Sequence, residues 1–276
     1  MNSARAAAWI RRILVGGIVA AWLGLTYNPH WGWWISGLAS TVILALGILA
    51  FGNRWPERLG LSTGARGALV FLAATAVALP ASIFLIDLVA RDAGVSFSAA
   101  GILDNTTSLA FTLGQTFNEE VVIGALLLLT LDRRFPARRG PIAVGVAALF
   151  ACMHVALYAS PHRVILYGAE PFVLDPLTIL SLFAVGVLRN NAILARGDIA
   201  LAWAIHLAFN IPFFVGHIWS ADGDPPLTEP EQFDAILGHP WMAALTVVLA
   251  AASFGLYRLN RRADATEPTP SSAPRP

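Results

Sequence analysis

The chain of 276 residues has little charge, no lysine and a single cysteine. Charged residues make up 13% of it, against about 25% in a typical soluble domain, and 57% of the residues are hydrophobic. This excludes a soluble globular domain and indicates an integral membrane protein. The lone Cys152 excludes an intrachain disulfide and a metal site built from several cysteines, and we expect it to be a small buried hydrophobic residue. All 18 basic residues are arginine, and the net charge of only +1 argues against a nucleic-acid partner.

Eight apolar segments have the length of membrane-spanning helices. They fall near residues 10–27, 34–51, 68–89, 107–131, 141–158, 172–188, 199–215 and 240–257. The sequence therefore predicts an all-α, polytopic membrane protein with one transmembrane domain over residues 1–262. The remaining residues, 263–276, are rich in proline and serine and are expected to form a disordered cytoplasmic tail.

The arginines indicate how these segments are oriented, because loops on the cytoplasmic side are enriched in positive charge. Alternate connections carry them: Arg5, Arg11 and Arg12; Arg54, Arg58 and Arg66; Arg133, Arg134, Arg138 and Arg139; Arg189 and Arg196; Arg258, Arg261 and Arg262. The intervening connections are poor in arginine, and the one over 216–239 is acidic. We therefore expect a multi-pass protein of the cell inner (plasma) membrane with both termini in the cytoplasm.

Strongly polar residues are rare inside these segments, and they fall at similar depths. Glu119 and Glu120 lie in the fourth segment, His154 in the fifth, and His206 and Asn210 in the seventh. At 1.5 Å per residue, Glu119 and His154 lie roughly 20 Å from the cytoplasmic end, and His206 and Asn210 roughly 10–18 Å. A carboxylate in the centre of a membrane helix costs about 2.5–3.5 kcal/mol on insertion scales. Their convergence predicts a shared functional cavity, open toward the cytoplasmic half of the membrane.

The two glutamates are not expected to face this cavity equally. Thr112, Gln115, Thr116 and Glu119 follow the i, i+3, i+4, i+7 spacing and form one polar stripe of a helix. Glu120 is rotated about 100° away from Glu119 on an α-helix, beside apolar residues. Glu119 is therefore the better candidate for a water-filled cavity.

Three motifs resemble those of the CAAX protease and bacteriocin-processing (CPBP, or Abi) family of intramembrane proteases. The family carries EExxxR, then FxxxH, then HxxxN or HxxxD, on successive helices. The chain matches these with Glu119 and Glu120, with Phe150 and His154 in FACMH, and with His206 and Asn210 in HLAFN. The stretches GVLRNN at 186–191 and RLGLS at 58–62 resemble weaker family signatures, so the resemblance covers roughly 58–215.

One motif departs from the family pattern. The arginine of EExxxR would stand four residues after Glu120, where the chain has Gly124. Without that arginine, Glu120 is expected to take a partner from another helix or to stay protonated in an apolar pocket. The departure puts catalytic competence in question.

The resemblance implies an intramembrane endopeptidase with a conical catalytic cavity. Its substrate would be a membrane-associated peptide or protein, because a bacterial chain is not expected to meet prenylated CAAX proteins. Glu119 is suited to act as general base on water, His154 and His206 to position that water, and Asn210 to donate to the developing oxyanion. If a divalent metal such as zinc is used, the resemblance gives His154, His206 and Glu120 as its ligands. The sequence leaves open whether the mechanism uses glutamate alone or a metal.

Two other classes of function stay open at this point. A catalytically silent family member could act as a binding or immunity protein, and Gly124 favours that reading. Carboxylates and histidines in the middle of a membrane also build relays in proton- or cation-coupled transporters. The sequence shows neither the inverted repeats nor the broken helices usual in transporters.

Overall fold

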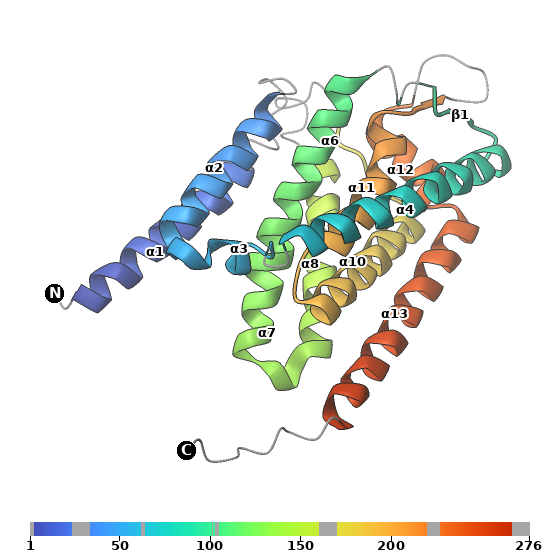
Figure 1. Cartoon of the computed structure of the whole chain (residues 1–276). Helices are drawn as coiled ribbons and strands as arrows, with labels where there is room; N and C mark the ends of the chain where they lie inside the picture. Colours follow the sequence, from blue (N-terminus) through green and yellow to red (C-terminus); the bar gives the residue numbers. More distant parts are fainter. Residues whose placement is uncertain are drawn as a thin grey trace.

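The computed structural model describes residues 3–23, 34–61, 64–100, 102, 105–159, 170–219 and 227–266. Helices dominate these residues, together with one two-stranded antiparallel sheet that pairs Phe97 with Ile218 (Figure 1). In chain order the elements are α1 Ser3–Ala21, α2 Trp34–Phe51, η3 Gly52–Arg54, α3 Trp55–Arg58, α4 Gly64–Asp92, β1 Ser96–Ser98, α6 Thr106–Glu119, η4 Glu120–Leu129, α7 Thr130–Arg134, η5 Pro136–Arg138, α8 Arg139–Ala159, α10 Pro176–Arg196, α11 Ala200–Phe214, β2 His217–Trp219, α12 Glu229–Leu237 and α13 Pro240–Thr266. The chain is therefore all-α, as predicted.

Every segment predicted to span the membrane overlaps a helix, but fewer helices meet the requirements of a span. By length and composition, four stretches of the described residues could cross a membrane: Gly37–Arg58, Gly64–Asp92, Pro136–Ala159 and Pro176–Arg196. A fifth is added if Pro230–Leu237 and Pro240–Gly255, which meet at 76°, form one bent span. The chain is a multi-pass membrane protein, while the number eight stays a prediction.

Helix α11 lies at the centre of the packing. It contacts α4, α6 and α10, while α10 also packs on α8 and α13, and α2 joins α1 to α6 (Figure 1). Helix α11 is buried on several sides, and its small residues Ala202, Ala204 and Ala208 allow neighbouring helices to approach closely. Helices α4 and α11 are close enough for a direct hydrogen bond, in which the Ser82 hydroxyl donates to the carbonyl of Ala208 at 2.5 Å.

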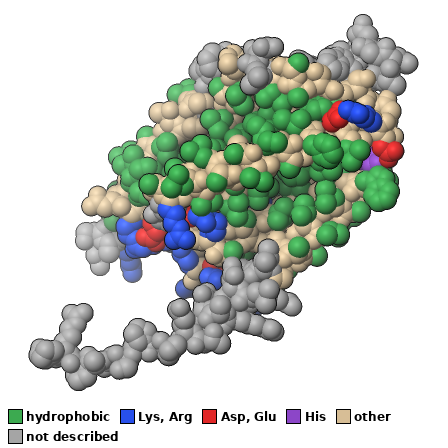
Figure 2. Space-filling view, turned by 45° about the vertical axis from the view of Figure 1, so that its right-hand side comes forward, with side chains coloured by type: hydrophobic (Ala, Val, Ile, Leu, Met, Phe, Trp, Pro, Cys, Tyr) green, Lys and Arg blue, Asp and Glu red, His purple; other side chains and the backbone are tan. Residues whose placement is uncertain are grey.

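The outer surface is apolar, as expected for contact with lipid. Leu69, Val77 and Phe84 on α4 are each at least 67% exposed. Figure 2 shows apolar side chains over most of the visible face, with most of the visible arginines gathered near one end. Cys152 also points outward, so the prediction that it is buried was wrong. Its neighbours Phe150 and Ala151 take the inward positions of α8 instead.

Helix α10 extends further than the sequence analysis predicted, and this moves an arginine into the core. The predicted span ended at residue 188, with Arg189 in a cytoplasmic loop, whereas α10 continues to Arg196. The Asp175 side chain caps its start, and Gly197, with φ of 73°, ends it. Asn190 stays inside because its amide donates to the carbonyl of Ala143 at 2.8 Å.

Three other predictions meet the structure only in part. Helix α13 continues to Thr266, so the start of the predicted tail over 263–276 is helical, and residues 267–276 lie outside the described part. The end of the first predicted span, beyond residue 23, also lies outside it. The acidic connection over 216–239 contains strand β2 and helix α12.

Candidate active site

The polar stripe of the fourth segment is buried in the bundle on helix α6. Thr112 and Thr116 are fully buried, and each hydroxyl donates to a backbone carbonyl of the preceding turn, at 2.8 and 2.9 Å. The indole nitrogen of Trp203 on α11 donates to the Thr116 hydroxyl at 3.1 Å. Gln115 lies 3.4 Å from Glu119, its amide nitrogen facing Oε1. These bonds satisfy both threonine hydroxyls of the stripe, and the bond from Trp203 ties α6 to α11.

At Glu120 the helix changes from α to π, and both glutamates approach one histidine of α11. Residues Glu120–Leu129 form a π-helix, whose i→i+5 bonds give wider turns and a smaller angle between consecutive side chains. His206 Nδ1 lies 2.9 Å from Oε1 of Glu120, and His206 Nε2 lies 3.7 Å from Oε2 of Glu119. The prediction that Glu120 faces away beside apolar residues was wrong, because His206 of α11 and Arg189 of α10 reach its carboxylate.

His154 is oriented by its own helix. Its Nδ1 lies 2.9 Å from the carbonyl oxygen of Phe150, and since a carbonyl only accepts, Nδ1 carries the proton. In the neutral ring, Nε2 is then left as an acceptor. The Phe150 ring packs edge-on against His154 at 4.6 Å and against His206 at 5.8 Å between ring centroids. The phenylalanine of the FACMH motif therefore separates and supports the two imidazoles.

His154, His206 and Asn210 line one small cavity between α8, α10, α11 and α12. Its volume of about 30 Å³ is enough for a water molecule, which needs about 10–15 Å³. Phe233 of α12 closes one side and stacks on Phe213 at 5.0 Å. Two of its lining residues, Phe233 and Leu237, belong to α12, which lies at the opposite end of the bundle from α7 (Figure 1). The side toward which the cavity opens stays a prediction.

Glu119 is not among the residues that line this cavity, but it is close to them. Its carboxylate faces the Nε2 edge of His206, and it interacts electrostatically with His154. Glu119 is 3% exposed, so these contacts are shielded from bulk water. All five residues singled out in the sequence thus belong to one constellation.

The sequence analysis missed one member of this constellation, Arg189. Its Nη1 lies 3.4 Å from Oε1 of Glu120, and both side chains are almost completely buried. Its Cζ lies 4.3 Å from the centre of the Phe150 ring. The capping residues of α10, Asp175 and Gly197, could have revealed it, because they place Arg189 two turns inside the helix.

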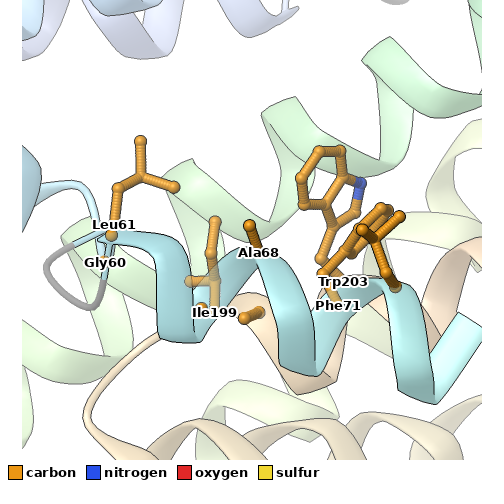
Figure 3. Close-up of a pocket in the computed structure, with 10 residues that line it drawn as sticks. Gly60, Leu61, Ala68, Phe71, Ile199 and Trp203 are labelled. Atoms are coloured by element: carbon orange, nitrogen blue, oxygen red, sulfur yellow. The ribbon is translucent and has the colours of Figure 1, made fainter.

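A second, larger cavity adjoins the site on the side of α4. It has a volume of about 380 Å³ and lies between the first turns of α4 and α11. Phe71 and Trp203 stand at one end and Gly60 and Leu61 at the other (Figure 3). Phe71 and Trp203 stack with their ring centroids 4.1 Å apart, and the walls are almost entirely apolar. Trp203 links this pocket to the site, because it also bonds to Thr116.

The ligand set left open for a metal does not fit this geometry. Nowhere in the described ranges do three or more histidine, cysteine, aspartate or glutamate side chains gather closely enough to hold a metal ion. Glu120 is bonded through Oε1 to His206 Nδ1, and His154 Nδ1 is bonded to a carbonyl. These bonds take Nδ1 of each ring and Oε1 of Glu120, and the described residues bring no set of three ligands together around the remaining atoms, so we derive no step through a metal.

The structure thus defines a polytopic helical membrane protein with a buried glutamate, histidine and asparagine site. Residues 104–212 match the family model described as type II CAAX prenyl endopeptidase Rce1-like. The resemblance seen in the sequence is therefore confirmed over this segment, which is similar to the CAAX protease family. Neither a curated protein nor a solved structure matches the chain.

Proposed function

We propose that the chain is an intramembrane endopeptidase that hydrolyses a peptide bond of a membrane-associated peptide or protein. The observation that carries this proposal is the contact of Glu119 with the edge of His206, next to a cavity that His206 shares with His154 and Asn210. Hydrolysis needs a base, a held water and an oxyanion donor, and this arrangement supplies each from a different residue. The family match over the same residues supports the reaction class.

Glu119 acts as the general base in this mechanism, because Glu120 is engaged by Arg189. A water held by Nε2 of His154 loses a proton to Glu119, and its oxygen bonds to the carbonyl carbon of the substrate. Asn210 donates its amide hydrogen to the oxyanion of the tetrahedral intermediate. As the C–N bond breaks, the proton passes from Glu119 through His206 to the leaving nitrogen. The water is consumed and the glutamate is regenerated.

The apolar pocket of Phe71 and Trp203 supports a substrate that approaches through the bilayer. Its walls offer contact to an apolar side chain or a lipid chain, and they offer little to a charged peptide. The matching family model is described as a type II CAAX prenyl endopeptidase. For this chain, the physiological substrate is to be decided by comparing lipidated and unlipidated peptides.

The purified chain in liposomes tests the proposal directly. The probes are a quenched fluorescent peptide ending in Cys-aliphatic-aliphatic-Met, with and without a farnesyl thioether, and a set of single-span peptides. We expect cleavage to produce new peptide termini, seen by mass spectrometry. These termini should be absent with Glu119→Gln and should still form when the protein has been dialysed against a chelator. If no probe is cut above the Glu119→Gln background, the endopeptidase proposal fails. A silent binder would then retain a probe without cutting it, and a transporter would carry ions in a flux assay.

A further inference from the structure

Arg189 is a buried cation in the middle of the bundle. It is 1% exposed, and its ion pair is with Glu120, which is fully buried. Burying a charge is costly unless a partner compensates it, so the position needs a specific reason. None of its three guanidinium nitrogens has a hydrogen-bond partner within the described ranges. Its contacts are the 3.4 Å approach to Glu120 and the 4.3 Å stacking over Phe150.

Gly124 explains why this cation does not come from the same helix as Glu120. A Cβ atom at position 124 would lie 2.6 Å from Cδ1 of Ile193 and 3.2 Å from Oε2 of Glu120. A side chain therefore does not fit while Ile193 occupies the space. Ile193 and Arg189 are four residues apart, so both lie on the face of α10 that meets η4. The helix that blocks position 124 is the helix that supplies an arginine.

We propose that Arg189 is the positioning residue that replaces the arginine missing at position 124, an inference that rests on the proposed function. Arg189 holds Glu120, and Glu120 holds Nδ1 of His206, so that Nε2 faces Glu119. Through Phe150, Arg189 also supports the ring of His154. Arg189 touches neither water nor substrate in this role. The arginine of the motif is then supplied from α10, and Gly124 does not indicate a catalytically silent protein.

Arg189 also compensates the charge of Glu120. Its guanidinium stays a cation in proteins, and it lies 3.4 Å from the Glu120 carboxylate where both side chains are out of bulk water. Loss of Arg189 leaves a negative surplus beside His206 in a site without bulk water. We expect the His206 imidazole to shift in response, so that its Nε2 no longer faces Glu119 and the reacting groups lose their alignment.

Four variants test the proposal with the probe peptides above. They are Arg189→Met, Arg189→Lys, the relocation variant Gly124→Arg/Ile193→Ala/Arg189→Met, and Arg196→Met as matched control. Arg196 lies on the same helix and pairs with the buried Asp198, but away from the site. We expect Arg189→Met to lower kcat by about 100-fold with KM nearly unchanged, as for a misplacement of about 1 Å. Arg189→Lys is expected to restore part of the loss, and the relocation variant most of it.

The ring nitrogens of His206, observed by NMR on ¹⁵N-histidine protein, give a readout that does not need a substrate. We expect their resonances to move in Arg189→Met and to stay in place in Arg196→Met. If no probe is cut by the wild type but these resonances move, the function fails and the placement of His206 by Arg189 stands. If Arg189→Met does not fold, the double variant Arg189→Met/Glu120→Gln is used in the NMR test in its place, because it removes the cation and its partner carboxylate together. Unchanged kcat and unchanged His206 resonances, or a folded relocation variant as inactive as Arg189→Met, would overturn the proposal.

Discussion

The Nδ1 atom of His206 lies 2.9 Å from Oε1 of Glu120, so the imidazole is held at one edge and presents the other to Glu119. The two adjacent glutamates thereby meet opposite nitrogens of one ring. Glu120 is also paired with Arg189, whereas Glu119 faces Gln115 and the two histidines. This division predicts that the two carboxylates respond differently to the same substitution.

Glu119→Gln should abolish hydrolysis and leave the fold intact. Removal of a general base typically lowers the rate by about 10²- to 10⁴-fold. Glu120→Gln leaves the Arg189 cation buried without its partner, which should lower the free energy of unfolding by about 3–5 kcal/mol. Initial rates and thermal unfolding in detergent separate the two effects. If Glu119→Gln is the destabilised variant and Glu120→Gln the stable, inactive one, the roles are reversed.

Asn210→Ala should lower kcat while KM changes little. The amide donor is needed only when negative charge develops on the carbonyl oxygen, and loss of one such donor costs about 10²- to 10³-fold in kcat. Asn191→Ala is a matched control, since Asn191 bonds to Ser253 on α13 and lies away from the cavity. A similar loss of kcat in both variants would show that Asn210 acts through the fold alone.

Gly60→Ala should destabilise the protein more than Gly52→Ala. Both glycines have positive φ, 71° and 53°, but a Cβ at Gly60 would lie 2.8 Å from Cγ2 of Ile199, while nothing lies within 4 Å of one at Gly52. Strain at such positions costs about 1–3 kcal/mol each, and the clash adds to it only at Gly60. Thermal unfolding of the two variants in the same detergent measures the difference. Equal losses would mean that Ile199 yields without cost.

Ala68→Trp should fill the apolar pocket beside the site and raise KM for a probe that uses it. The pocket of about 380 Å³ is large enough to accept the indole, and Ala68 stands between its two ends (Figure 3). We expect kcat at saturation to stay near the wild-type value, because the substituted residue does not line the cavity of His154 and Asn210. Comparison of farnesylated and unlipidated probes shows which of them depends on the pocket. Unchanged KM for both would exclude it from substrate binding.

Both termini should lie in the cytoplasm, with the connection before α12 on the other side. Single cysteines at Ser220 and Ser271 test this with an impermeant thiol reagent on right-side-out vesicles. Cys152 is exposed and must first be replaced by serine. Labelling of both positions from the same side would contradict the odd number of spans expected between them and the predicted orientation.

Much of the helical arrangement was readable from the sequence, because long apolar segments leave few alternatives in a membrane. The convergence of His154, His206 and Asn210 was readable as well, from equal depth along three helices. The exact placement of Glu120 was not, since its partners His206 and Arg189 come from two other helices that only the fold brings to it. Arg189 was missed because the arginine count was used to assign loops, although Asp175, Pro176 and Gly197 delimit a helix that contains it. The caps at Asp175 and Gly197 place Arg189 inside a helix, but its ion-pair partner Glu120 comes from another helix that only the fold brings near.

The shortness of α11 has a consequence for the lipid around the protein. Its 15 residues extend for about 22 Å, less than the roughly 30 Å of a bilayer's hydrocarbon layer. Its first backbone groups are covered from within the protein, since Ile199 donates to the carbonyl of Gly60 and Ala200 to the carboxylate of Asp198. The helix that carries His206 and Asn210 can therefore begin below the level of the lipid headgroups, where the bilayer must thin or the protein must tilt to meet it. Acyl-chain length thus becomes a variable of the proposed hydrolysis, and we expect short-chain lipids to favour access of water to a site that thick bilayers would seal.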